Sequence, residues 1–240
     1  MGSDPLPPQE KDIANRLADV RGRLREAALR SGRQPEAVLL LAVSKTFSLE
    51  HIRAAAEAGQ HDFGESRVQE GLQKIERSAD LQITWHLIGT LQSNKARKAA
   101  AEFSWIHSVN SLDLLKRIDT AAAETGSHPT LLVQVDLAGE ATKHGVPPRL
   151  VPDLMREASS CRAARIVGLM TIPPFFDDPE RTRPYFIRLR ELRKTLLEEG
   201  IEPALLSELS MGMSHDFEIA VQEGATIVRI GTAIFGKRRV

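Results

Sequence analysis

A lysine directly follows a run of apolar residues near the beginning of the chain. The run Leu39–Val43 leads through Ser44 to Lys45, so the ammonium group stands where a buried strand would end. Desolvation disfavours charged lysine and lowers its pKa from the usual value of about 10.4, which exposes the amine lone pair for attack on a carbonyl carbon. Lys45 is therefore a candidate Schiff-base lysine. The alternative is a strand-end lysine whose ammonium group extends into water.

Two segments rich in glycine and hydroxyl groups lie near the end of the chain, Ser210–Ser214 and Gly231–Gly236. Their glycines would let backbone N–H groups approach an anion closely, and the hydroxyls of Ser210 and Thr232 would add donors. Taken singly, the glycines could be turn residues, and either serine of the first segment could cap a helix. Two such segments, each after an apolar run, predict a phosphate site.

Arg229 ends the last apolar run, between these two segments. A guanidinium group carries only donors and keeps its proton, so facing a pyridine nitrogen it would leave that nitrogen unprotonated. An unprotonated ring is a poor electron sink, which disfavours the carbanion chemistry of transaminases. The alternative is that Arg229 pairs with a carboxylate such as Glu208.

The elements that must position these side chains are predicted by hydrophobic periodicity. Short apolar runs bounded by turn residues predict eight strands. They are Val38–Val43, His61–Gly64, Thr84–Ile88, Trp105–Val109, Leu131–Val135, Ile166–Met170, Ala204–Leu209 and Thr226–Ile230. Helical spacing lies between them, as at Leu112, Leu115 and Ile118.

Strands that alternate with helices pair in parallel, because a tight turn cannot reconnect parallel strands. Eight such units predict an α/β fold, a single (β/α)₈ TIM barrel, with an open doubly wound sheet as the alternative. An extra amphipathic helix is expected from about residue 10 to 31, before the first strand. We expect residues 1–9 to be a flexible N-terminus and residues 10–240 to form one domain. In such a barrel, the residues that follow the strands share one rim.

Composition narrows the class of protein. The 32 basic residues balance the 32 acidic residues, so the charge excess of a nucleic-acid-binding protein is absent. Cys161 is the only cysteine, which excludes an internal disulfide and a cysteine zinc cage, and we expect no metal site. No apolar run approaches the roughly 20 residues of a transmembrane helix, and the proline-rich start differs from a signal peptide. These features predict a cytoplasmic protein.

Several ordered motifs from about residue 10 to the end carry a family resemblance. They are Ala42–Lys45, Asp62–Glu65, Val68–Glu70, Trp85–Gly89, Leu91–Lys95, Gly168–Thr171, Ser210–Ser214 and Arg229–Gly236. Together they resemble the pyridoxal phosphate homeostasis proteins, a family related to the barrel domain of bacterial alanine racemase. The resemblance implies a protein that binds pyridoxal 5'-phosphate (PLP) and takes part in vitamin B6 homeostasis.

The resemblance also implies site residues. Lys45 would carry PLP as a Schiff base, and Arg229 would face the pyridine nitrogen. The phosphate would be held by Ser210, Met211, Gly231 and Thr232.

Two further positions have open roles. His86 would line the pocket, or else be a buried histidine with satisfied hydrogen bonds. Ser66 stands where the family more often has asparagine, so it either contacts the cofactor or caps the next helix in a capping box with Gln69.

Three functions are compatible with these residues. The first is a PLP carrier that is not an enzyme, is monomeric and serves PLP-accepting apoenzymes. The second is an amino-acid racemase-like enzyme that needs a partner, because two-base racemisation requires a second proton donor and the only tyrosine, Tyr185, is predicted within a helix. The third is a Schiff-base aldolase that uses Lys45 without PLP. A long loop at 137–147, with Glu140 and Lys143, has no role that the sequence assigns.

Overall fold

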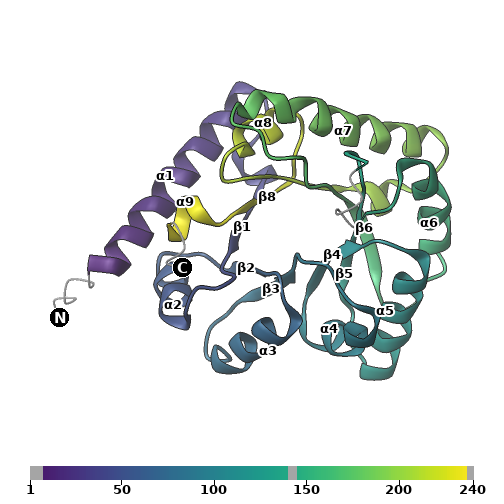
Figure 1. Cartoon of the computed structure of the whole chain (residues 1–240), viewed down its shortest axis with the longest axis horizontal. Helices are drawn as coiled ribbons and strands as arrows, with labels where there is room; N and C mark the ends of the chain where they lie inside the picture. The colour runs from purple at the N-terminus through teal and green to yellow at the C-terminus, as the bar shows by residue number, and fades with distance from the viewer. Residues whose placement is uncertain (1–7, 140–144, 237–240) are drawn as a thin grey trace.

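The computed structural model describes residues 8–139 and 145–236. Its strands form one closed barrel in which each strand pairs in parallel with the next and β8 pairs with β1 (Figure 1). The strands are β1 (Leu39–Val43), β2 (Asp62–Glu65), β3 (Thr84–Leu87), β4 (Trp105–Val109), β5 (Thr130–Gln134), β6 (Arg165–Met170), β7 (Glu208–Met213) and β8 (Ile227–Ile230). The predicted (β/α)₈ barrel is confirmed, and the open-sheet alternative is excluded.

Helices surround the barrel and connect its strands (Figure 1). They are α1 (Pro8–Arg30), α2 (Leu49–Glu57), α3 (Val68–Arg77), α4 (Ala96–Glu102), α5 (Leu112–Thr125), α6 (Val151–Ala158), α7 (Arg183–Glu198), α8 (Phe217–Gln222) and α9 (Thr232–Phe235). Within the described part of the chain, no helix is both long and apolar enough to cross a membrane.

The extra N-terminal helix is confirmed as α1. Its apolar stripe, which includes Ile13, Leu17, Val20 and Leu24, is buried, as the spacing predicted. The helix contacts α2 and α8, so it lies where a full-length helix after β8 would otherwise complete the outer ring (Figure 1). Residues 1–7 of the expected flexible N-terminus lie outside the described range, and α1 begins at Pro8, two residues before its expected start.

Apolar side chains fill two separate regions. One lies between the strands and the surrounding helices and contains most of the buried apolar residues. The other is a smaller cluster that includes Leu41, Leu132, Met170 and Ile227. Because side chains alternate between the two faces of a strand, every second residue of each strand points into the barrel. Polar residues of β2, β3, β4, β7 and β8 share that interior with the smaller cluster.

The seventh strand differs from its prediction. The sequence predicts a strand at 204–209, but Pro203–Leu206 forms a 3₁₀ helix and β7 runs from Glu208 to Met213. Gly212 has a φ of 91° within this strand, and the pairing with β8 shifts register between Ser210 and Met213. The irregular strand contains Ser210 and Gly212, residue types that are typical of a loop. Ser210 and Met211 therefore lie within β7 and not after it.

Candidate functional site

The strand that leads to Lys45 and the strand that leads to Gly231 are neighbours in the barrel. Ala42 of β1 pairs with Ile230 of β8, and a Cβ atom at Gly231 would lie 3.3 Å from the Val43 carbonyl oxygen. Lys45 is half-buried in the turn directly after β1. Lys45 and the glycine segment therefore both lie at the carboxyl rim, at the ends of neighbouring strands, where ligands of such barrels bind.

The residue before Lys45 is hydrogen-bonded to both members of a buried ion pair. The Ser44 hydroxyl donates to Glu65 Oε1 over 2.7 Å, and Lys74 Nζ donates to the same Oε1 over 2.7 Å and to the Ser44 carbonyl oxygen over 2.9 Å. Burial raises the pKa of Glu65, although Lys74 and Ser44 favour its ionised form. Its Oε2 atom has no hydrogen-bond partner among the residues that the structure describes.

The residue after Lys45 is also hydrogen-bonded to a charged side chain that contacts Lys74. Thr46 has a left-handed φ of 69°, and its backbone nitrogen donates to Glu70 Oε1 over 2.6 Å. Lys74 Nζ also donates to Glu70 Oε1, over 2.8 Å. A positive φ is costly for a β-branched residue and persists only where the surroundings impose it. The cluster Glu65–Glu70–Lys74 thus fixes the backbone on both sides of Lys45.

At the end of β8, one serine hydroxyl accepts hydrogen bonds from two backbone N–H groups. Ser214 Oγ accepts from the backbone nitrogen of Gly231 over 3.1 Å and from that of Ala233 over 3.3 Å. Thr232 lies between these two donors and is exposed. Ser214 does not cap α8, because the residue at that N-cap position is Asp216. Two N–H groups therefore converge on the Ser214 hydroxyl at the rim beside β1, next to the exposed Thr232, and anion sites are built from groups of these kinds.

Ser210 has a different environment from Ser214. It is fully buried in β7, its hydroxyl oxygen accepts from Arg229 Nη1 over 2.7 Å, and it lies 3.0 Å from His107 Nδ1. Without a ligand, both partners of this hydroxyl lie inside the barrel, and its expected contact with phosphate stays a prediction. Met211 points to the other side of β7 and packs in the apolar layer, so only its backbone could face a ligand.

Arg229 is 4% exposed, and its partners lie within the barrel. Its Nη2 atom donates to the Thr171 carbonyl oxygen over 2.8 Å, in addition to the bond with Ser210. Burial lowers its pKa to about 10, so the group stays charged at neutral pH. The alternative pairing with Glu208 does not form; each hydrogen-bond partner that the structure gives this guanidinium group is neutral.

His86 is fully buried, and both of its ring nitrogens have hydrogen-bond partners, while its expected place in the lining of the PLP pocket stays a prediction. Its Nε2 atom lies 3.1 Å from Asp62 Oδ1, and its Nδ1 atom lies 3.0 Å from His107 Nε2. Sequence reasoning missed Asp62 and His107. A signal existed, since each is a polar residue on the inward-facing alternation of a predicted strand.

Ser66 directly follows β2 at the carboxyl rim and is half-buried. It does not complete the expected capping box, because the N-cap of α3 is Arg67 and no side chain caps that helix. The loop at 137–147 is described only at its ends, where Asp136 Oδ1 accepts from the backbone nitrogens of Ala138 and Gly139. Glu140 and Lys143 lie outside the described residues.

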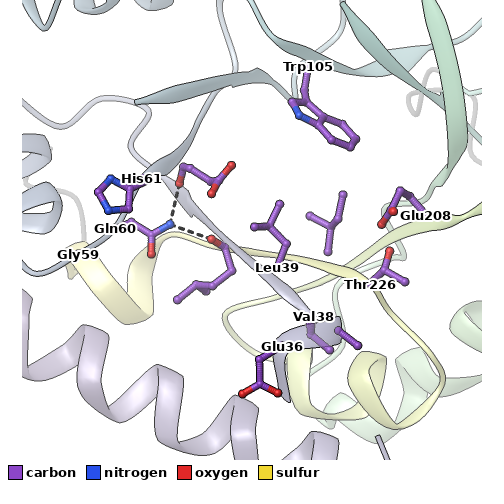
Figure 2. Close-up of a pocket in the computed structure, with 13 residues that line it drawn as sticks. Glu36, Val38, Leu39, Gly59, Gln60, His61, Trp105, Glu208 and Thr226 are labelled. Carbon is purple, nitrogen blue, oxygen red and sulfur yellow. Dashed lines mark hydrogen bonds between the residues drawn. The ribbon is translucent and has the colours of Figure 1, made fainter. Parts of the chain in front are cut away.

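A cavity of about 530 Å³ opens at the opposite end of the barrel, at the amino ends of β1, β2, β4, β7 and β8 (Figure 2). Trp105, Glu208, Leu39 and Thr226 project into it, and Asp62 also lines it. This cavity is separate from the rim that carries Lys45. Among the described residues, no group of His, Cys, Asp or Glu side chains is arranged to hold a metal ion.

The chain is similar to known proteins over most of its length. Residues 17–239 match the family described as the alanine racemase N-terminal domain. The chain is 43% identical to the pyridoxal phosphate homeostasis protein of Aquifex aeolicus over 228 residues, which is 95% of this chain and 99% of that protein. It is 44% identical to the protein of the same name from Pseudomonas aeruginosa, over 94% of this chain and 96% of that one.

The fold is also similar to those of solved structures. PipY of Synechococcus elongatus, solved with PLP bound, is 43% identical with a TM-score of 0.82, over 93% of this chain and all of that one (100%). An alanine racemase of Clostridium difficile shares the fold at 15% identity, with a TM-score of 0.74 over 96% of this chain and 58% of the racemase.

Proposed function

The chain belongs to the family of pyridoxal phosphate homeostasis proteins, and from this membership we propose that it binds PLP at the carboxyl rim of the barrel and serves in PLP homeostasis. Two full-length relatives carry that name, and the related PipY was solved with PLP bound. In this role the protein holds the cofactor.

One observation carries the proposal: the strand before Lys45 and the strand before Gly231 lie side by side. PLP supplies, when bound, an aldehyde that forms a Schiff base with an amine and a pyridine ring that can accept electrons. Lys45, in the turn directly after β1, would supply that amine. The Ser214 hydroxyl and the N–H groups of Gly231 and Ala233, with the Thr232 hydroxyl, would hold the phosphate. Ser66 and the backbone of Met211 remain candidates for further contacts.

The chemistry of Arg229 favours a protein that holds PLP over an enzyme that uses PLP in catalysis. A charged guanidinium group has no acceptor, so facing the pyridine nitrogen it would leave that nitrogen unprotonated and the ring a weak electron sink. We therefore propose that the protein has no catalytic activity of its own and releases PLP to apoenzymes. Incubation with L-alanine in deuterium oxide should give no exchange of the α-hydrogen above that of free PLP. Faster exchange would favour the racemase-like alternative.

The direct test is reduction with borohydride followed by peptide mapping. PLP-loaded protein should carry the reduced label on the peptide that contains Lys45, and Lys45→Ala should lose the label while it keeps its circular dichroism spectrum. Lys98→Ala removes an exposed lysine of α4 and serves as the matched control. Label that persists in Lys45→Ala would assign the cofactor to another lysine. Cell fractionation and light scattering test the proposed cytoplasmic location and monomeric state.

A further inference from the structure

A row of hydrogen-bonded side chains crosses the barrel from Arg229 to the cavity at the opposite end. We call it the interior relay; it consists of Arg229, Ser210, His107, His86 and Asp62, from β8, β7, β4, β3 and β2. The four contacts measure 2.7, 3.0, 3.0 and 3.1 Å in that order. Four of the five residues are at most 4% exposed. Asp62 is the exception, because it lines the cavity of Figure 2.

The chemistry of its two ends determines the direction of every bond. Arg229 can only donate, and an ionised Asp62 can only accept. The Ser210 oxygen accepts from Arg229, so its hydroxyl hydrogen is available for His107 Nδ1. A neutral imidazole has one donor and one acceptor nitrogen, so His107 then donates from Nε2 to His86 Nδ1. His86 in turn donates from Nε2 to Asp62 Oδ1, which leaves each polar atom along the row with a matched partner.

Burial supports the neutral state of both rings. Desolvation lowers the pKa of His86, although Asp62 favours its charged form. Desolvation also lowers the pKa of His107 well below its usual value, and the neighbouring His86 and Arg229 act in the same direction. Trp105 stacks on His86 with ring centroids 5.3 Å apart and so covers one face of that ring.

We propose that the interior relay is a positioning device in which a one-way row of hydrogen bonds, ending on Asp62, holds the guanidinium group of Arg229 in place for the cofactor ring. His107, His86 and Asp62 are then positioning residues, since they act through Ser210 and not by contact with a ligand. The proposal deepens the proposed function and rests on it, because it takes Arg229 to face the pyridine nitrogen. It assigns a role to residues at the end of the barrel opposite Lys45.

The first test needs no cofactor. Long-range ¹⁵N–¹H spectra of protein freed of PLP, at pH 7, should show both His86 and His107 neutral and protonated on Nε2. A ring that is charged or protonated on Nδ1 would overturn the assigned direction. This result is independent of PLP binding, so it separates failure of the relay from failure of the proposed function.

The second test asks whether the far end affects Arg229. In Asp62→Ala, His86 loses its acceptor, and we expect the nitrogen shifts of His107 and the visible absorption maximum of bound PLP both to change. Asp62→Asn keeps an acceptor oxygen and should restore both signals toward those of the unmodified protein. If Asp62→Ala folds and leaves both signals unchanged, the relay does not extend to Asp62 and the proposal fails.

Ser210→Ala cuts the relay next to Arg229 and covers the case in which Asp62→Ala does not fold. We expect PLP affinity to fall about tenfold, because a hydrogen bond to a charged group is lost inside the barrel, with a shift of the absorption maximum. Ser108→Ala is the matched control: Ser108 is also fully buried, beside His107, but its hydroxyl donates to the Gly89 carbonyl oxygen over 2.7 Å. Equal behaviour of the two serine variants would contradict the relay.

Discussion

Ser214 Oγ lies 3.1 Å from the backbone nitrogen of Gly231, which joins the turn after β7 to the end of β8. The contact brings a hydroxyl and an N–H group to one point beside β1. Ser210, four residues earlier, instead contacts Arg229 inside the barrel. The two serines of one motif therefore have different environments.

Ser214→Ala and Thr232→Ala should weaken the binding of PLP about tenfold each while they barely change the binding of pyridoxal, which lacks the phosphate. The reason is that each variant removes a hydroxyl donor from a charged group. Fluorescence titration with the two ligands measures the ratio of their affinities. We expect Ser210→Ala to weaken both ligands equally.

Ser207→Ala is the control for these serine variants, because Ser207 precedes β7 and donates to the Val167 carbonyl oxygen at the other end of the strand. If Ser214→Ala keeps the full preference for PLP over pyridoxal, Ser214 is not a phosphate ligand.

Lys74→Met should destabilise the protein by about 3–5 kcal/mol, because it leaves the carboxylate of Glu65 buried without its cation. The side chains of Lys74 and Glu65 are 11% and 0% exposed, so solvent screens this pair little. Urea denaturation measures the free energy of unfolding. Adding Glu65→Gln to Lys74→Met should recover part of the loss, and a single variant within about 1 kcal/mol of the unmodified protein would contradict the prediction.

Gly212→Ala should cost about 2–4 kcal/mol of stability. Gly212 has a φ of 91°, and a Cβ atom there would lie 2.5 Å from Ala220 Cβ and 3.0 Å from Phe217 Cα. Gly22→Ala is the matched control, since Gly22 lies inside α1 with nothing within 4 Å of the added atom. That variant should be neutral or more stable by up to about 1 kcal/mol. Similar losses in both would show that the close approach at Gly212 has no cost.

Acid should destabilise the protein through the buried histidines. Because the folded-state pKa of His107 lies well below its usual value, the unfolded chain binds more protons than the folded one as the pH falls below about 6.5. The contribution of His107 to the free energy of unfolding is fully present above that pH. It is lost below that pH, by up to about 1.4 kcal/mol at pH 5.5. His86 shifts in the same direction.

His107→Gln isolates this effect, because glutamine keeps a donor and an acceptor but does not titrate. Urea denaturation at pH 7.5 and pH 5.5 should show a smaller loss of stability in the variant. Burial raises the pKa values of Glu65 and Asp216, so their contribution to the free energy of unfolding is lost as the pH rises through their folded-state pKa values. This contribution is the same in the variant and in the unmodified protein. Equal losses in variant and unmodified protein would mean that His107 is charged at one of these pH values in the folded state.

Most elements of the fold could be predicted because their signals are local. The spacing of apolar residues in α1, α5 and α7 follows the helical period, and most strands match their predicted runs within a few residues. The exception is β7, where Gly212 has a positive φ and the register with β8 shifts. A strand with this irregularity has no regular alternation that a sequence pattern could reveal.

The amino-acid sequence alone determined the order of strands and helices, and therefore that Lys45 and the glycine segment at the end of the chain share one rim, since closure brings the first and last strands together. Tertiary structure alone decided which polar groups meet. His107 and Ser210 are 103 residues apart in sequence, and Arg229 and Ser210 are 19 apart. The alternation along a strand indicates which face a residue occupies, but contacts of this kind also depend on the register between strands, which the neighbours of a residue in sequence do not encode.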